Sequence, residues 1–130
     1  MILIDTDICI ELLRGNIKVL PHMQRNHGDI AVSFITAGEL YYGAFNSTDP
    51  KYNLALIETF LETLPVIQSD NGIMEKFGEL KARLRIKGQM LPDADIIIAS
   101  TCLEKCSRLV TGNIRHYNRF ESVELEDWTK

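Results

Sequence analysis

Short apolar runs alternate along this chain with longer segments in which apolar residues recur every three or four positions. Short apolar runs bounded by polar or turn-forming residues are typical of buried strands. We therefore predict strands at residues 2–4, 30–34, 66–67, 109–111 and 123–125.

The segments between these runs have the period of amphipathic helices. Ile73, Phe77, Leu80 and Leu84 lie on one helix face, and Gly88 marks its end. The same pattern predicts helices at residues 8–13, 17–26, 36–45, 54–64, 71–87 and 92–105. Because strands separated by helices need crossover connections, we expect an α/β fold, a three-layer sandwich with a mostly parallel central sheet. Ligands of such sheets bind beyond the carboxyl ends of the strands.

Composition limits the possible functions. With 130 residues, 45% of them hydrophobic and 25% charged, the chain is expected to form a single domain over residues 1–130. No apolar run is long enough to cross a bilayer, and no basic stretch precedes the first one, so we expect a cytoplasmic protein. The net charge of -4 argues against a large basic face that binds nucleic acid by charge alone.

Several familiar kinds of site are absent from the sequence. Cys9, Cys102 and Cys106 form no C-x-x-C pair and the histidines show no ligand spacing, which argues against zinc and suits a reducing compartment. No P-loop, dinucleotide-binding or nucleophile-elbow motif is present either. Nucleotide-triphosphate and serine-hydrolase chemistry therefore lose their main support.

Acidic and amide side chains follow several predicted strands. Asp5 comes directly after the first strand, and Glu39 is expected in the first turn of the helix after the second. Asp93 and Asp95 open the helix at residue 92, and Asn113 follows the strand at 109–111. The expected topology brings these groups to one edge of the sheet.

Each of these residues also has a purely structural interpretation. Asp5 or Asp7 could cap the following helix, Thr36 and Glu39 match a capping box, and Asp93 suits a helix start. Taken together, however, several carboxylates at one cleft repel each other and cost stability unless a cation compensates them. Ligands that are all oxygen favour Mg²⁺ or Mn²⁺, which activate water and stabilise charge on a phosphoryl group. The leading chemistry is therefore phosphodiester hydrolysis.

Four ordered segments carry a more specific pattern that spans nearly the whole chain. They are Ile-Leu-Ile-Asp-Thr-Asp at 2–7, Ser-Phe-Ile-Thr-Ala-Gly-Glu-Leu-Tyr-Tyr-Gly at 33–43, Asp-Ile-Ile-Ile-Ala at 95–99, and Leu-Val-Thr-Gly-Asn at 109–113 with Tyr117 and Phe120. This order resembles that of PIN-domain ribonucleases, most closely the toxin halves of VapBC-type bacterial toxin-antitoxin pairs. The tail at 123–128 is similar to the family's last strand and tryptophan.

The resemblance implies a role for each matching position. Asp5, Glu39 and Asp95 match the family's acidic triad and would hold the metal, while Thr111 and Asn113 match its polar pair. Thr6 would help to orient ligands and water. Asp95 is preferred to Asp93 because it stands three residues before Ile98-Ala99, and Asp93 remains either an additional ligand or a cap. The chain departs from the family at His116, where many relatives have an acid.

The resemblance also implies an activity and partners. The protein would be a Mg²⁺- or Mn²⁺-dependent endoribonuclease that cuts transfer or ribosomal RNA. It would form a homodimer and be silenced by a cognate antitoxin whose peptide covers the acidic cleft.

The residues that could contact RNA have two interpretations. The basic residues could steer an RNA backbone or form a solvated surface: Arg14, Lys18, Lys81, Arg83, Arg85, Lys87, Arg115 and Arg119. Tyr41 and Tyr42 could stack on a base or pack against a helix.

Three alternatives to a metal-dependent ribonuclease stay open. Asp5-Thr6-Asp7 partly matches the start of haloacid-dehalogenase-type phosphatases, with Asp5 as nucleophile and Asp7 as general acid. A receiver-like module would accept phosphate on an aspartate, and a PIN-like module without catalysis would only bind.

Overall fold

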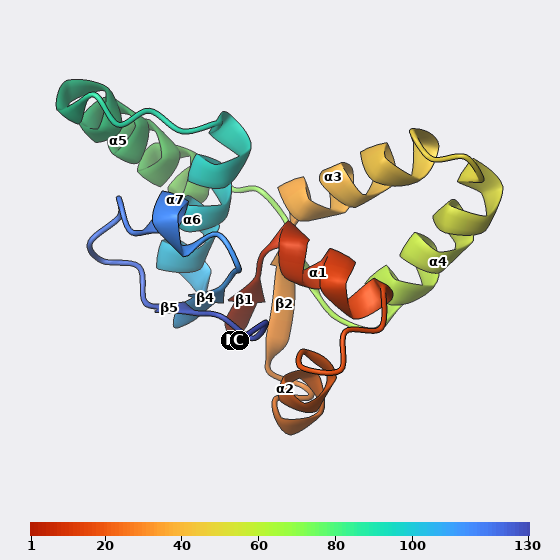
Figure 1. The fold of residues 1–130 in the computed structure, drawn as a ribbon. Coiled ribbons are helices and arrows are strands. Elements are labelled where there is room, and N and C mark those ends of the chain that lie inside the picture. The colour runs from red at the N-terminus through yellow and green to blue at the C-terminus, as the bar shows by residue number, and fades with distance from the viewer.

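A five-stranded parallel sheet lies at the centre of the molecule, with helices on both faces (Figure 1). The computed structural model describes all residues 1–130. The strands are β1 (Ile2–Ile4), β2 (Ile30–Ser33), β3 (Val66–Ile67), β4 (Arg108–Val110) and β5 (Leu125–Glu126). Their order is β3-β2-β1-β4-β5, and every neighbouring pair is parallel. The predicted α/β class and parallel sheet are confirmed.

Every helix except α7 begins where the sequence supplies a side-chain cap or a proline. The helices are α1 (Thr6–Leu13), α2 (Leu20–Arg25), α3 (Phe34–Phe45), α4 (Pro50–Glu62), α5 (Asn71–Lys87), α6 (Asp93–Lys105) and α7 (Ile114–Tyr117). Asp5, Ser33 and Asp70 accept backbone N–H bonds at the starts of α1, α3 and α5. Gly88 ends α5 at φ 66°, in the left-handed region that glycine enters without strain.

Several predicted boundaries were wrong, and α7 was not predicted. α3 begins at Phe34 because Ser33 caps it, so Glu39 lies in its second turn rather than its first. α4 begins at Pro50, after the Asp49 cap, four residues earlier than predicted. The last strand is Leu125–Glu126 rather than 123–125. These segments contain turn-forming residues that also serve as helix caps, which shifts the boundary.

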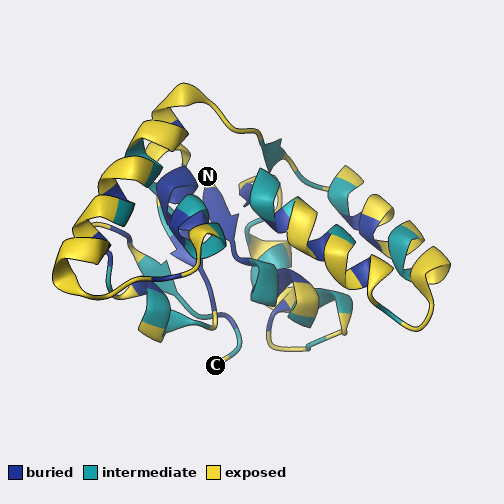
Figure 2. Ribbon diagram, turned by 90° about the horizontal axis from the view of Figure 1, so that it is seen from above, coloured by how far each residue is buried: buried dark blue, intermediate teal, exposed yellow.

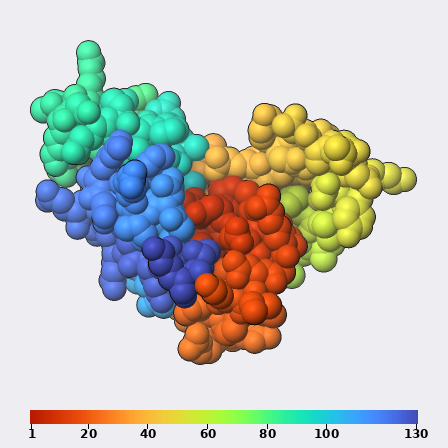
Figure 3. All heavy atoms as spheres, in the orientation of Figure 1, coloured from red at the N-terminus to blue at the C-terminus, as the bar shows by residue number.

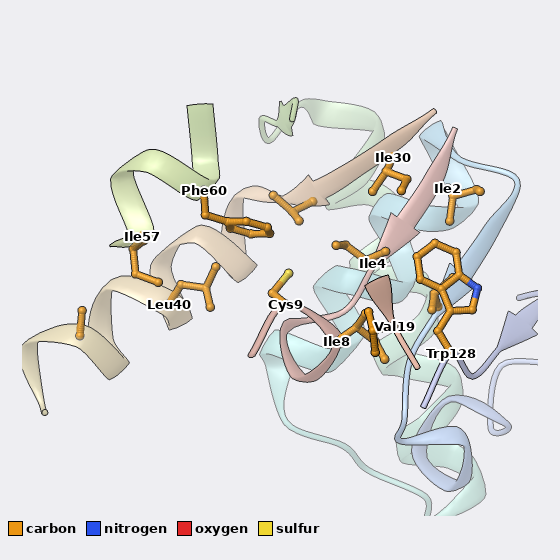
Figure 4. Packing of buried hydrophobic residues seen from close by; sticks show 13 residues of the cluster. Ile2, Ile4, Ile8, Cys9, Val19, Ile30, Leu40, Ile57, Phe60 and Trp128 are labelled. Carbon is orange, nitrogen blue, oxygen red and sulfur yellow. The ribbon is translucent and has the colours of Figure 1, made fainter. Parts of the chain in front are cut away.

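The side chains of β1 point alternately to the two faces of the sheet, and a hydrophobic cluster lies on each face. Ile2 and Ile4 point to the face covered by α1 and α4, while Leu3 points to the face covered by α5 and α6. Figure 4 shows the first cluster, in which Ile57 and Phe60 of α4 lie near Leu40. β1 and β2 are buried, the edge strands β3 and β5 are half-buried, and the outer faces of the helices are exposed (Figure 2). Apolar side chains therefore cover both faces of β1, and only its carboxyl end is accessible to a ligand.

Two arms extend beyond the carboxyl ends of the strands. The hairpin of α3 and α4 forms one arm, and α5 forms the other (Figure 1). The space-filling view shows a broad notch between the arms, with α1 at its base (Figure 3). None of the helices has the length and apolarity needed to span a membrane.

Candidate active site

The centre of the site lies between β1 and β4, where the strand order reverses. β1, β2 and β3 run outward in one direction, and β4 and β5 lie on the other side of β1. Connections that leave adjacent strands in opposite directions create a crevice at their carboxyl ends. Asp5 follows β1 and Thr111 follows β4, so both residues face this crevice.

Asp5 is a buried carboxylate with both oxygens engaged. Its Oδ1 accepts from the backbone N–H of Thr6 at 2.8 Å, and its Oδ2 accepts from the Thr111 hydroxyl at 2.7 Å. Burial, and after it the charges of Asp7 and Asp95, raise the pKa of Asp5 from 3.8 to about 7, against the lowering effect of its two hydrogen bonds. The negative charge at this position is thus incompletely compensated by the protein.

Glu39 is connected to Asp5 through Thr6. The Thr6 hydroxyl donates to Glu39 Oε1 at 2.7 Å and lies 3.0 Å from the hydroxyl of buried Thr36. Because Glu39 itself is exposed on α3, Thr6 is the contact that holds its carboxylate toward the sheet. Thr6 therefore links the starts of α1 and α3.

Asp95 is connected to Asp5 from the other side, through the segment after β4. The Thr111 hydroxyl accepts from the backbone N–H of Asn113 at 2.9 Å. His116 Nδ1 lies 2.8 Å from Asn113 Nδ2 and 3.1 Å from Asp95 Oδ2. The two contacts compete, because Nδ1 needs a proton to donate to Asp95 and a lone pair to accept from an amide N–H. The partner of Nδ1 depends on the tautomer of the ring.

One set of hydrogen bonds and polar contacts thus connects the three acids of the predicted triad, with the two contacts of His116 as alternatives to each other. In order, it runs through Glu39, Thr6, Asp5, Thr111, Asn113, His116 and Asp95. These residues come from four separate segments of the chain: β1-α1, α3, the start of α6, and the β4-α7 region. The structure brings together every predicted site residue except Asp93.

Asp7 ties the start of α1 to the loop after β4. Its Oδ2 accepts from the backbone N–H of Gly112 at 2.9 Å, and a Cβ on Gly112 would lie only 2.8 Å from that oxygen. Burial raises the pKa of Asp7 as well. With Asp7 engaged by Gly112 and both Asp5 oxygens hydrogen-bonded, the pair is not arranged as the free nucleophile and general acid of a phosphatase.

Tyr117 forms an apolar wall beside the acids. Its side chain is fully buried, and its hydroxyl has no hydrogen-bond partner in the structure. Burial, and after it the charges of Asp5, Asp95 and Asp7, raise the pKa of this phenol above its ordinary value of 10. Tyr117 therefore stays protonated and presents a neutral O–H to the acidic site.

Comparison with known proteins identifies the fold family. The model of the PIN domain family matches residues 2–121. The chain belongs to the PIN domain family. Its membership, predicted from the four ordered segments, is thereby confirmed.

Relatives of this PIN domain align over nearly their full lengths. Ribonuclease VapC2 of Haemophilus influenzae is 35% identical over 127 residues, covering 97% of this chain and 96% of that protein. The tRNA(fMet)-specific endonuclease VapC of Shigella flexneri is 31% identical, covering 98% and 97%. Among solved structures, DNA-bound VapBC from Salmonella typhimurium is similar with a TM-score of 0.93 and 30% identity, covering 98% of this chain and 97% of that chain.

Asp93 lies apart from the other acids of this PIN domain. Its carboxylate is more than half exposed and forms an ion pair with Lys81 Nζ at 2.9 Å. It is not the helix cap either, because Pro92 occupies the N-cap position of α6. The capping-box interpretation of Thr36 and Glu39 was also wrong, since α3 starts at Phe34.

Two residues of the site were not recognised as such from the sequence. In the sequence, His116 stood out only as a departure from the resembling family, and Tyr117 only as part of a motif. Both lie on α7, a helix of 4 residues that is too short to show a periodic pattern. Their spacing from Asn113 was the only available signal.

The donor set fits a hard divalent cation in its chemistry. Asp5, Glu39 and Asp95 offer oxygen ligands only, and Asp5 carries a buried charge that its neighbours oppose. Their side chains do not form a closed ligand cage, because no three His, Cys, Asp or Glu residues are grouped closely enough to hold a metal. Hydrogen bonds to Thr6 and His116 hold Glu39 and Asp95 at the periphery instead.

Proposed function

We propose that this PIN-domain protein is an endoribonuclease toxin of a toxin-antitoxin pair, and that Asp5, Glu39 and Asp95 hold a Mg²⁺ or Mn²⁺ ion. The supporting observation is that polar contacts connect all three carboxylates across the β1-β4 crevice, through Thr6, Thr111, Asn113 and His116. It collects acidic groups around a buried, poorly compensated Asp5, which is the environment a cation would stabilise.

The relatives support the same function. Those named ribonuclease or endonuclease bear out the prediction of RNA cleavage. Structures of VapBC from Salmonella typhimurium and of VapBC2 from Rickettsia felis support the predicted cognate antitoxin. The names of two relatives specify tRNA(fMet), which favours transfer RNA over ribosomal RNA as the first substrate to test. The homodimer stays a prediction.

Each polar residue would have a distinct part in the reaction. A divalent ion, when bound, polarises the scissile phosphate and lowers the pKa of water. Thr111 holds Asp5 in one rotamer, and Thr6 does the same for Glu39. Asn113 is fixed through its backbone N–H and its side-chain Nδ2 lies against His116, which leaves its Oδ1 to orient water. Tyr117 excludes bulk water from one side of Asp5, which strengthens electrostatic interactions within the site.

Cleavage of total cellular RNA by the purified protein tests the proposal. We expect discrete products with Mg²⁺ or Mn²⁺, none with chelator, and none with Asp95→Asn. Asp93→Asn is the matched control, because it makes the same chemical change two residues away on a side chain paired with Lys81. Cleavage that persists in chelator or in Asp95→Asn would refute the metal-triad mechanism. An intact, folded protein that cuts no RNA with either metal would refute the function.

A further inference from the structure

A second polar pocket lies between the end of α5 and the segment after α7. It has a volume of about 200 Å³ and a floor of buried apolar residues, Leu80, Leu84 and Phe120. Arg83, Lys87 and Arg119 line its rim, together with Glu121 and Ser122. Three cations against one carboxylate give this rim a net positive charge in a chain whose overall charge is -4.

Two of the three cations of this pocket have no carboxylate partner. Several lysines and arginines in the same half of the chain are paired with carboxylates: Lys76 with Glu79, Lys81 with Asp93, Lys105 with Asp70, and Arg108 with Glu126. Arg85 and Arg115 are unpaired as well. At the pocket, Arg83 shares Glu79, while Lys87 and Arg119 have no carboxylate partner. The helix dipole accounts for Lys87 in the last turn of α5, but it does not account for Arg119.

Arg119 is held in place by neutral groups. Its Nη1 donates to the backbone carbonyls of Gln89 and Met90, both at 3.1 Å. Nε and Nη2 have no hydrogen-bond partner in the protein. The guanidinium is therefore positioned while part of its planar set of N–H donors stays free, which suits binding to a phosphate oxygen.

The pocket and the site share two segments. Arg119 follows His116, which contacts Asp95, by three residues. The loop after Lys87 runs back from the far end of α5 to the start of α6, where Asp93 and Asp95 lie (Figure 1). Short stretches of chain therefore connect the pocket to the acids.

We infer that Arg83, Lys87 and Arg119 form a phosphate-binding site for the backbone of the RNA substrate, next to the cleavage site. This inference rests on the proposed ribonuclease function. An acidic active site repels the phosphates of its own substrate, so binding must come from cations placed outside the metal ligands. The pocket supplies contacts to phosphate that carry no sequence information, which places the RNA without choosing the bond to be cut.

Salt dependence of RNA binding tests the inference. Labelled bulk tRNA is titrated in EDTA, so that it is not cut, at several KCl concentrations. Each lost phosphate contact lowers the slope of log Kd against log[KCl] by about 0.7–0.9. For Arg83→Gln/Lys87→Gln we expect a slope lower by roughly 1.4–1.8 and binding weaker by roughly tenfold at low salt. Arg119 is left unchanged because it also bridges two loops.

The matched control removes the same charge elsewhere. Lys51→Gln/Arg85→Gln alters an exposed residue of α4 and one of α5, neither of which lines the pocket. It is expected to keep the wild-type slope, and the charge-conserving Arg83→Lys/Lys87→Arg is expected to keep most of it. In cleavage assays with metal, KM should rise for the pocket variant while kcat stays unchanged.

The outcomes separate this inference from the proposed function. Equal slope changes in the pocket variant and the control would show general charge attraction and overturn the phosphate site. An unchanged slope in the pocket variant would overturn it as well. Either result could coexist with normal cleavage by the wild-type protein, which would leave the ribonuclease function standing.

Discussion

The two halves of the acidic site differ in how the protein treats charge. On one side, Asp5 and Thr111 are 6% and 0% exposed and bonded to each other at 2.7 Å. On the other side, Glu39 lies on α3 and Asp95 lies on α6. Glu39 contacts Thr6, and Asp95 contacts His116. The buried half is rigid and electrostatically unfavourable, whereas the peripheral half is open to rearrangement. We infer that the buried charge of Asp5 is what a bound cation would stabilise, and that the side chains of Glu39 and Asp95 would rearrange to coordinate it.

Replacement of the buried carboxylate should have the largest effect. Asp5→Asn keeps the size of the side chain and removes its charge, so we expect cleavage to fall by roughly 10³-fold, equivalent to about 4 kcal/mol of transition-state stabilisation. The folded protein should be at least as stable as the wild type at neutral pH, because the buried charge is gone. RNA cleavage and thermal unfolding measure the two effects. If Asp5→Asn proved inactive because it is unfolded, the expectation that Asp5 serves cleavage rather than stability would be contradicted.

Without metal, stability should depend on pH through Asp5. Its pKa is 3.8 ordinarily and about 7 in the folded protein, so between these values the folded chain binds a proton that the unfolded chain does not. Stability should therefore fall as pH rises from about 4 through 7, by about 4 kcal/mol at most. Denaturant unfolding in chelator at several pH values measures this slope, and Asp5→Asn should reduce it. A profile identical in wild type and variant would exclude Asp5 as its source.

Loss of one hydroxyl should weaken the buried half without removing its charge. Thr111→Val deletes the donor to Asp5 and the acceptor for Asn113, so we expect the pKa of Asp5 to rise further and cleavage to fall roughly tenfold. Thr101→Val is the matched control, because Thr101 is also buried but donates to the Ile97 carbonyl within α6. Equal losses of activity in both variants would indicate a general packing defect.

The smallest effect is expected at the edge of the peripheral half. Asp93→Asn removes an exposed ion pair with Lys81, which is worth less than about 1 kcal/mol of folding stability. We expect cleavage to change by less than roughly threefold, because Asp93 lies outside the connected set of hydrogen bonds. Cleavage assays beside Asp95→Asn give the comparison. A loss as large as that of Asp95→Asn would make Asp93 a ligand.

The strand ends were the most predictable part of the molecule. Asp5 and Thr111 follow short apolar runs whose crossover connections require a parallel sheet, and that sheet places both residues at one edge. Glu39 was placed correctly on its helix but in the wrong turn, because Ser33 competes with Thr36 as the cap. The motif spacing correctly favoured Asp95 over Asp93, but the partners of these two side chains, His116 and Lys81, were not predicted. Such choices depend on neighbours that only tertiary packing supplies.

The bond between Asp5 and Thr111 joins residues 106 positions apart, near opposite ends of the polypeptide. The central strand of the sheet, β1, pairs with β2 and with β4. The sheet therefore cannot be completed until most of the chain has been synthesised. Parallel sheets with such distant pairings fold slowly, since the entropy of closing long loops is lost before the contacts form. During translation, Asp5 thus leaves the ribosome long before its partner exists. A newly made chain passes through an interval in which it has no assembled acidic site, and under the proposed mechanism it cannot cut the RNA around it within that interval.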